Sequence, residues 1–239
     1  MNAQDLELSL KKYADEKDAL FLQRFFKTGK GQYGEGDIFI GVRMPQLRLV
    51  CKQFSDLQLR EVQKLLNSKV HEHRMAALII LRLQYRLSSE QKKDSIYNLY
   101  LKNVYRGRIN NWDLVDASAP YIVGDHLMNR SRTILFELAK NNDIWQRRVA
   151  VLGSFAFINE GDSTTTIELA EQLLQDRHDL IQKAVGWSLR EVGKRSDRAI
   201  LIHFLDQHAH EMPRTMLRYS LEHLDAKQRA YYMSLKSSS

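Results

Sequence analysis

The stretch NNWDLVD, residues 110–116, places an aromatic ring and two carboxylates close together. On a helix, Trp112 and Asp116 are four residues apart and Asp113 and Asp116 three apart, so these side chains share one side. Carboxylates serve in acid–base chemistry, and an aromatic face attracts cations. The structural alternative is a helix start with Asp113 as N-cap, Asp116 at the third helical position and Trp112 in the core. By itself the stretch favours that alternative.

A second tryptophan strengthens the case for chemistry. Trp187 lies in QKAVGWSLR, residues 182–190, and Arg190, three residues later, faces the same way on a helix. Gly186 inside that helix costs about 1 kcal/mol relative to alanine, which indicates close packing or the close approach of another group. Trp145, near the start of another predicted helix, is interpreted as a packing anchor.

The histidines do not form a metal-binding pattern. His71 and His73 are two residues apart, so their rings point to different sides of a helix and make a poor chelate. His203, His208 and His210 have no cysteine or glutamate partner in a metal pattern. We therefore expect all five histidines on the surface, and no metal site.

The composition is that of a globular protein with a basic surface. The 239 residues, 44% of them hydrophobic, suffice for a full core, and the net charge of +7 with a pI near 9.4 favours polyanions or anionic surfaces. The N-terminus resembles no secretory signal, and the longest apolar run, residues 75–81, is too short to span a membrane, so we expect a cytoplasmic protein. The single cysteine, Cys51, is interpreted as a packing residue.

Helices are predicted for almost the whole chain. Three prolines and 11 glycines are too few for the turns of a β-protein, and apolar residues recur at spacings of three and four, so the fold class is all-α. The predicted helices cover residues 6–26, 46–54, 57–66, 72–85, 89–100, 112–122, 126–139, 144–157, 164–174, 180–195, 197–208 and 213–221.

One sequence shape repeats along the chain. It is seen in HEHRMAALIIL at 71, IWQRRVAVLGSF at 144 and LIQKAVGWSLREVG at 180. Each stretch begins with a polar part and has a cationic residue before a run of small or apolar residues. With NNWDLVDASAPYIVG at 110 and MPRTMLRYSLEHL at 212, the shape recurs roughly every 31–39 residues, close to the period of helical-pair solenoids. We expect one α-solenoid domain over residues 1–239, with residues 236–239 as a frayed tail.

A solenoid would gather scattered cations on one surface. Equivalent positions on its inner helices line a concave face, and a basic groove of that kind tracks a phosphate backbone. The alternative, favoured by charge alone, is ordinary helix cations whose apolar stems cover the core while their charges stay in water. The cations concerned are Arg74, Arg147, Arg148, Lys183, Arg190, Lys194 and Arg214.

A glycine-rich stretch, KTGKGQYGEGDIFIG, covers residues 27–41. It lacks the order of a Walker phosphate loop, and the apolar residues that close it argue against a linker. Residues 34–37 can form the turn of a short β-hairpin whose strands are residues 32–33 and 38–40. The hairpin would lie within an insertion at residues 27–43.

Three cations, Lys27, Lys30 and Arg43, lie at the base and flank of this hairpin. There they would touch DNA at the N-terminal edge of a basic groove. An alternative of equal weight is a rigid loop that packs Tyr33 and Phe39 against the first helix pair.

The motifs together resemble a known family. The resemblance is carried by NNWDLVDASAP, NNDIWQRRVAVL and IQKAVGWSLREVGK, which in this order and spacing are similar to the HEAT-like repeat DNA alkylation repair family, the AlkD-type DNA glycosylases. It covers nearly the whole chain and implies an α-solenoid with a concave, basic DNA-binding face. It also implies that Trp112, Asp116 and Trp187 are the active-site residues and that Arg148 and Arg190 contact DNA.

The resemblance further implies a reaction, the monofunctional hydrolysis of the N-glycosidic bond of cationic alkylpurines such as N3-methyladenine and N7-methylguanine. Because the charged base leaves easily, the enzyme mainly stabilises an oxocarbenium-like sugar and directs water at it. Asp116 can do both, and the faces of Trp112 and Trp187 can attract the developing cation. The implied protein is a monomer that binds DNA without a deep base pocket, a metal or a cofactor.

Two departures leave a second function open. Asn111 stands where such glycosylases carry another tryptophan, and they lack the insertion at residues 27–43. FFKTGKGQYGEGD and FIGVRMPQLR look more like a sister branch with a projecting β-hairpin, little glycosylase activity and affinity for branched DNA. The alternative is thus a weakly or non-catalytic binder of branched or distorted DNA. The predicted DNA contacts are Lys27, Lys30, Arg43, Arg147, Arg148, Lys183, Arg190 and Lys194.

Overall fold

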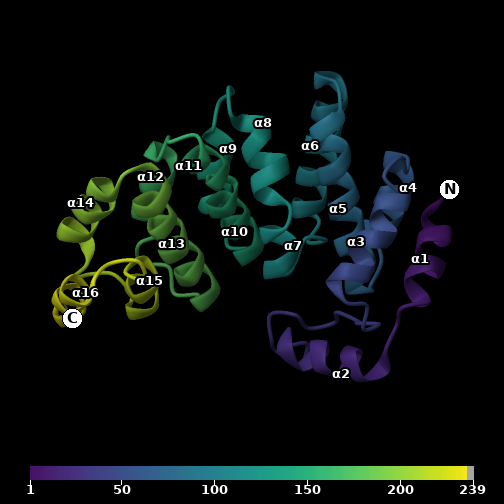
Figure 1. Cartoon of the computed structure of the whole chain (residues 1–239), viewed down its shortest axis with the longest axis horizontal. Helices are drawn as coiled ribbons and strands as arrows, with labels where there is room; N and C mark the ends of the chain where they lie inside the picture. Colours follow the sequence, from purple (N-terminus) through teal and green to yellow (C-terminus); the bar gives the residue numbers. More distant parts are fainter. Residues whose placement is uncertain (236–239) are drawn as a thin grey trace. The chain divides into compact units, whose positions relative to one another are not determined.

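The computed structural model describes residues 1–235, so the predicted frayed tail at residues 236–239 lies outside the described part. Every regular element in that part is helical, which confirms the all-α prediction (Figure 1). The chain divides into two compact units, residues 1–118 and residues 119 onward, which are described separately. One DNA-binding domain over residues 1–239 stays a prediction. No helix of the described part is both long and apolar enough to cross a membrane.

Side-chain caps define the first two helices of the first unit. Asn2 and Asp5 form a reciprocal capping box at the start of α1, and the Asp15 carboxylate accepts a backbone hydrogen bond in the first turn of α2. Asp15 is extended and its N–H donates to the Ile40 carbonyl, so the single helix predicted over residues 6–26 is wrong. The helices of this unit are α1 (Ala3–Lys11), α2 (Glu16–Phe25), α3 (Met44–Gln53), α4 (Leu59–Leu66), α5 (His71–Leu87), α6 (Glu90–Tyr105) and α7 (Trp112–Asp116).

The core of the first unit lies between α3, α4 and α5. Leu47, Leu65 and Leu78, one from each helix, are fully buried. Cys51 on α3 is buried as well, which confirms its predicted packing role, and burial raises the pKa of its thiol to about 12. Helix α2 differs from these helices, because none of its residues is fully buried and it runs across the ends of α3 and α5 (Figure 1).

The second unit repeats one packing pattern. Helix α10 packs against α9, and α13 packs against α10 and α15 (Figure 1). Where α13 meets α15, a Cβ atom on Gly186 would lie 2.4 Å from the Met216 carbonyl oxygen, which confirms the predicted close packing. Trp145 is buried at the start of α10, as predicted. The elements are the π-helical η1 (Pro120–Gly124), α8 (Asp125–Leu127), α9 (Thr133–Ala139), α10 (Ile144–Gly153), α11 (Phe155–Asn159), α12 (Thr164–Gln172), α13 (Asp179–Glu191), the π-helical η2 (Val192–Ser196), α14 (Arg198–His208), α15 (Arg214–Ser220) and α16 (Ala226–Ser234).

The repeated sequence stretches correspond to α5, α7 with η1, α10, α13 with η2, and α15. Within each unit, helices close to one another in the chain pack together, such as α3 and α4 against α5 and α9 against α10, as in a HEAT-like α-solenoid. Helix α16 was not predicted, because its sequence has little apolar periodicity and Tyr232 is its single buried residue.

Residues 27–43 form a loop, and the predicted β-hairpin is wrong. Instead of pairing within the segment, Ile38 makes an isolated parallel bridge with Val70, just before α5. The Glu72 carboxylate on α5 then accepts hydrogen bonds from the N–H groups of residues 40–42. The backbone N–H groups that a hairpin strand would use for pairing therefore donate to the Glu72 side chain instead.

Candidate active site and nucleic-acid interface

The short helix α7 carries Trp112 and Asp116 at its first and last positions. Its N-cap is Asn111, whose side-chain oxygen accepts a hydrogen bond from the Trp112 N–H at 2.9 Å. The N-cap predicted at Asp113 is wrong, because that residue lies inside the first turn, where its carboxylate accepts from the Leu114 N–H at 2.8 Å. Trp112 and Asp116 are half-buried, so both keep a face accessible to another molecule.

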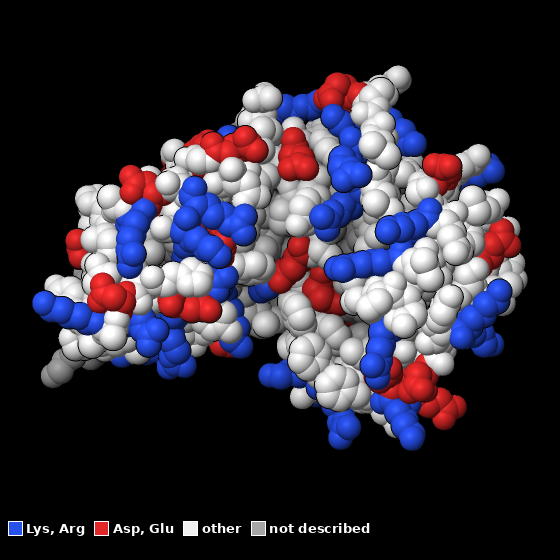
Figure 2. All heavy atoms as spheres, viewed as in Figure 1, with Lys and Arg blue, Asp and Glu red and all other residues white. Residues whose placement is uncertain are grey.

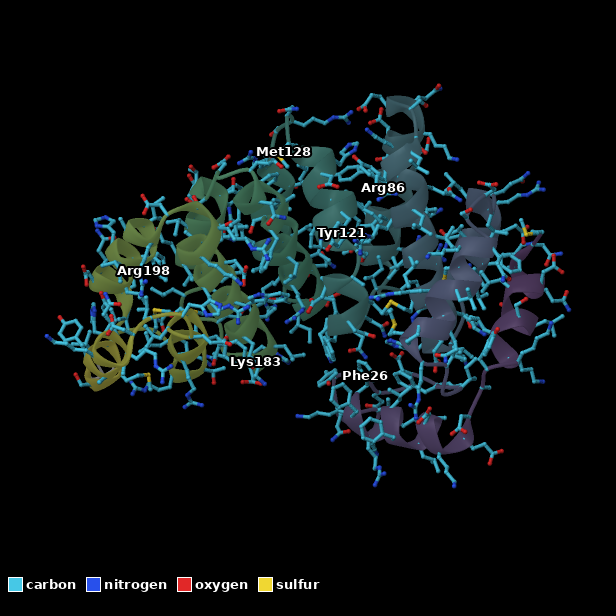
Figure 3. All side chains as sticks on the ribbon, viewed as in Figure 1. Phe26, Arg86, Tyr121, Met128, Lys183 and Arg198 are labelled. Atoms are coloured by element: carbon cyan, nitrogen blue, oxygen red, sulfur yellow. The ribbon has the colours of Figure 1, made fainter. Side chains whose placement is uncertain are left out.

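Trp112 belongs to an aromatic cluster, defined here as Phe25, Phe26, Phe39, His71 and Trp112. The Trp112 ring stacks on Phe26, with centroids 5.3 Å apart and planes 21° apart, and meets Phe25 edge-on at 6.0 Å. Phe26 stacks in turn on Phe39 at 5.1 Å, as the loop alternative predicted for Phe39. Phe26 lies between the end of α2 and α7 (Figure 3). The plane of the indole is therefore set by residues in and beside the glycine-rich loop.

A buried imidazole joins the glycine-rich loop to α7. His71 Nδ1 lies 3.0 Å from Asp37 Oδ2 and Nε2 lies 2.8 Å from Asp113 Oδ2, so each ring nitrogen can donate to a carboxylate. Burial by itself would lower the pKa of His71, but Asp113 and Asp37 raise it to about 9, so the ring is an imidazolium at neutral pH. We name this arrangement the Asp37–His71–Asp113 bridge.

The bridge contradicts two predictions from the sequence. His71 was expected on the surface but is 2% exposed, and Arg74 was expected on the basic face but is buried and donates to Asp37 Oδ1 at 2.6 Å. Although burial raises the pKa of Asp37, hydrogen bonds and charge from His71 and Arg74 bring it below its usual value. In the sequence, this cluster was indicated by the four consecutive ionisable residues of HEHR.

Within residues 1–235, no group of three or more His, Cys, Asp or Glu is placed to hold a metal ion.

Asp116 lies close enough to the buried phenol of Tyr100 to act on it electrostatically. Burial and, to a smaller extent, the charge of Asp116 raise the pKa of Tyr100 above its ordinary value. The Tyr100 hydroxyl is 3.0 Å from the Ser118 hydroxyl, which satisfies it. A half-buried carboxylate in such surroundings is screened less than one in water, so its charge acts more strongly on neighbouring groups.

Trp187 lies in the second unit, on α13. Its ring meets Phe155 edge-on at 4.8 Å, and its indole N–H donates to Glu191 at 3.2 Å. The Arg190 guanidinium is 6.0 Å from the centre of the same ring. Because Trp112 and Asp116 belong to the first unit, the meeting of all three residues in one active site stays a prediction.

Arg147 and Arg148 hold parts of the second unit together. Arg147 forms a 2.7 Å ion pair with Asp176 and donates to two backbone carbonyls just before α10. Arg148, which is 5% exposed, donates to the Leu180 carbonyl at 2.7 Å and so ties α10 to the start of α13. These bonds serve the fold, and contact of either arginine with DNA stays a prediction.

The other predicted cations of the second unit are more accessible. Lys183 forms a 2.7 Å ion pair with the aspartate four residues before it, and Lys194 is exposed. Arg190 pairs with Glu191 at 2.8 Å and also with Glu222. To contact a phosphate, Arg190 and Lys183 would have to exchange or share these carboxylate partners.

In the first unit, Lys27 and Lys30 are exposed on the glycine-rich loop, and the Lys27 ammonium lies 5.9 Å from the centre of the Tyr33 ring. Arg43 is also exposed but is held by both carboxylate oxygens of Asp18, at 2.5 and 2.8 Å. Figure 2 shows positive side chains on both units with negative ones among them. The predicted concave basic groove stays a prediction.

Comparison with known proteins agrees with the resemblance seen in the sequence. A family model described as "DNA alkylation repair enzyme" matches residues 6–224. A solved structure described as a predicted DNA alkylation repair enzyme from Enterococcus faecalis is 16% identical, covers 89% of this chain and 97% of its own, and superposes with a TM-score of 0.71, which supports the same fold. No protein of curated function matches the chain. With a family model matched over nearly its whole length, this chain belongs to the DNA alkylation repair enzyme family.

Proposed function

We propose that this protein is a monofunctional DNA glycosylase that hydrolyses the N-glycosidic bond of cationic alkylpurines, such as N3-methyladenine and N7-methylguanine, without a deep base-flipping pocket. The observation that carries the proposal is the geometry of α7, where Trp112 and Asp116 are both half-buried on one helix. Family membership makes alkylated DNA the expected substrate.

The residues suit the chemistry of this reaction. An alkylpurine that carries a positive charge needs little protonation to leave, so the main task is to stabilise the positive charge that develops on the sugar. The Asp116 carboxylate supplies the opposite charge and can accept a hydrogen bond from the attacking water. The faces of Trp112 and Trp187 can attract the same developing cation. None of these steps calls for a metal or a cofactor.

The surroundings of α7 support precise placement of these groups. A helix of five residues is not stable by itself, so its position depends on outside contacts. Here the Asn111 cap, the Phe26 stack and the salt bridge to His71 act on its first two residues. Electrostatic catalysis depends on such preorganisation, because a charge that is already in place needs no rearrangement during the reaction.

DNA is the partner in this proposal, bound by a monomer. Lys27, Lys30 and Lys194 are exposed and suited to phosphate contacts, whereas Arg148 is engaged in the fold. Phosphate contacts release counterions, so affinity should fall steeply with rising salt.

The decisive experiment measures release of N3-methyladenine and N7-methylguanine from methylated duplex DNA. Asp116→Asn should lower the release rate by about 100- to 1,000-fold, as loss of a preorganised charge does, while DNA affinity stays nearly unchanged. Asp56→Asn, at an exposed aspartate between α3 and α4, is the matched control and should keep full activity. Undiminished release by the Asp116 variant would exclude the role assigned to this residue.

A second candidate function is binding of branched or distorted DNA with little or no catalysis. It is favoured by one observation, the two exposed lysines on the glycine-rich loop. Changing Lys27 and Lys30 to alanine should then weaken binding to four-way junctions more than to duplex, whereas the same change at the exposed Lys11 and Lys12, where α1 ends, should not. Junction preference combined with no release of methylated bases would favour this function over the glycosylase.

A further inference from the structure

Helix α2 exposes two aromatic rings to solvent. Phe21 and Phe25 lie one helical turn apart and are 57% and 53% exposed. Their ring centroids are 6.1 Å apart and their planes differ by 16°, so the rings lie nearly parallel. We name them the exposed aromatic pair. Neighbouring exposed apolar side chains, unlike scattered ones, mark a surface where another molecule binds.

Three exposed cations follow close by in the chain. Arg24 lies in the last turn of α2, and Lys27 and Lys30 lie in the glycine-rich loop just after it. Within residues 1–235, none of the three forms an ion pair with a carboxylate, in contrast to Arg43 and Arg190. Figure 2 shows positive side chains beside the end of α2 that leads into the loop and negative ones toward its start. The charges of the three cations are therefore available to an anion.

Most carboxylates of α2 and the loop already have partners. Asp15 caps the start of α2, Asp18 is paired with Arg43, and Glu35 accepts from the Gly31 N–H at 2.7 Å. The remaining two are Asp37, which belongs to the buried bridge, and the exposed Glu16. The free charge on this surface is therefore mainly positive, which favours an anionic partner.

Lys27 has a backbone conformation that lysine rarely adopts. Its φ is 51°, the one positive φ outside glycine in the part of the chain that the structure describes. The backbone by itself would favour glycine at this position. The lysine is therefore better explained by a use of its side chain than by the turn that it forms.

We propose that the exposed aromatic pair and these three cations bind unpaired bases of single-stranded DNA. Single-strand sites combine aromatic side chains, on which bases stack, with cations along the phosphate backbone. An apolar partner would account for the rings but not for the cations. DNA is the polyanion expected for a member of a DNA alkylation repair family. Phe25 meets Trp112 edge-on, so these bases would lie beside the proposed catalytic helix.

This site does not depend on the glycosylase reaction. It names the feature of branched or distorted DNA that the second candidate function would recognise, namely unpaired bases. A four-way junction keeps its bases paired, so preference for a junction and preference for unpaired bases are separate results.

Duplexes with single-stranded tails test the proposal. The probes are an unmethylated blunt duplex and the same duplex with a tail of about six nucleotides, within the site size of a single-strand binding module. One tail carries thymines, and the other consists of abasic sites that keep the phosphates. Fluorescence anisotropy should show the thymine tail bound more tightly than the abasic tail, and the blunt duplex bound most weakly.

Phe21→Ala should weaken binding of the thymine tail by about 5- to 10-fold, the lower end of the range for loss of a stacked base, and leave the abasic tail unchanged. The fold should tolerate this change, because the ring is exposed. Leu20→Ala is the matched control, since Leu20 is 63% exposed on the same helix but has no ring. It should leave binding of both tails unchanged.

Lys27→Gly tests the cations without harm to the fold. Glycine relieves the positive φ, so the variant should be at least as stable as the wild type in thermal unfolding. Because the lost contact is to a phosphate, it should weaken binding of the thymine and abasic tails by a similar factor.

Three outcomes would overturn the proposal. One is equal affinity for the thymine and abasic tails, and another is a loss with Phe21→Ala no larger than with Leu20→Ala. The third is tighter binding of a uracil RNA tail than of the thymine tail, which would assign the surface to RNA. Base release is measured on methylated duplex, so failure of the glycosylase proposal would leave the result with the tails unaffected.

Discussion

The Nε2 atom of His71 lies 2.8 Å from a carboxylate oxygen of Asp113, the residue that follows Trp112 on α7. Through its other nitrogen, the same ring reaches Asp37 in the glycine-rich loop at 3.0 Å. A buried positive charge between two carboxylates thus fastens the loop to the helix that carries the proposed catalytic residues. This contact accounts for the defined position of a helix too short to form alone.

The charge on His71 should make stability depend on pH. Its pKa is raised from 6.5 to about 9, so its contribution is complete below pH 6.5 and is lost as pH rises through 9. His71→Gln should therefore destabilise the protein by up to about 3 kcal/mol at pH 6.5 and by clearly less at pH 9.5. Urea unfolding of both proteins at the two pH values measures this. A difference that does not change with pH would show that the imidazole is not charged.

The aromatic contact between Phe25 and Trp112 should affect the rate more than the stability. Phe25 is 53% exposed, so Phe25→Ala should change the free energy of unfolding by less than about 1 kcal/mol. Because the ring meets Trp112 edge-on, we expect base release to slow several-fold with little change in DNA affinity. Single-turnover release with Leu20→Ala as control checks this, and equal rates for the two variants would contradict it.

Substitution of Arg148 should mainly lower the stability of the fold, whereas substitution of Lys194 should mainly affect DNA binding. Arg148→Ala removes the hydrogen bond that this buried side chain donates to the Leu180 carbonyl and should cost about 1–3 kcal/mol of stability. Lys194 is exposed, so Lys194→Ala should leave stability within about 0.5 kcal/mol and, if it contacts a phosphate, reduce the salt dependence of DNA binding by about one charge. Thermal unfolding and binding isotherms at several salt concentrations distinguish the two effects.

Gly186 should not tolerate even one methyl group. The added Cβ atom would lie 2.4 Å from the Met216 carbonyl oxygen and 2.6 Å from the Tyr219 Cβ, so α13 and α15 would have to separate. We expect Gly186→Ala to destabilise the protein by about 1–3 kcal/mol despite the better helix propensity of alanine. Gly29→Ala, on the exposed loop, meets only the flexible Gln32 side chain and should be nearly neutral.

Much of the fold could be predicted from the sequence because its signals are local. Apolar residues at spacings of three and four indicate a helix wherever that helix packs. The sequence shape that recurs along the chain indicates which helices are equivalent. The burial of Cys51 and Trp145 and the tight contact at Gly186 followed from the same patterns. The NNWDLVD and KAVGW motifs likewise placed the chain in its family before any geometry was known.

The long-range contacts of the first unit were decided only by the tertiary structure. The members of the Asp37–His71–Asp113 bridge are 34 and 42 positions apart, and no periodic pattern links residues at such separations. The loop at 27–43 had the residues of a hairpin, but the Glu72 carboxylate and the bridge to Val70 offered its backbone other partners. Sequence therefore determined which helices form and which family the chain belongs to. Packing determined which charges became buried, because burial depends on what the rest of the chain places around them.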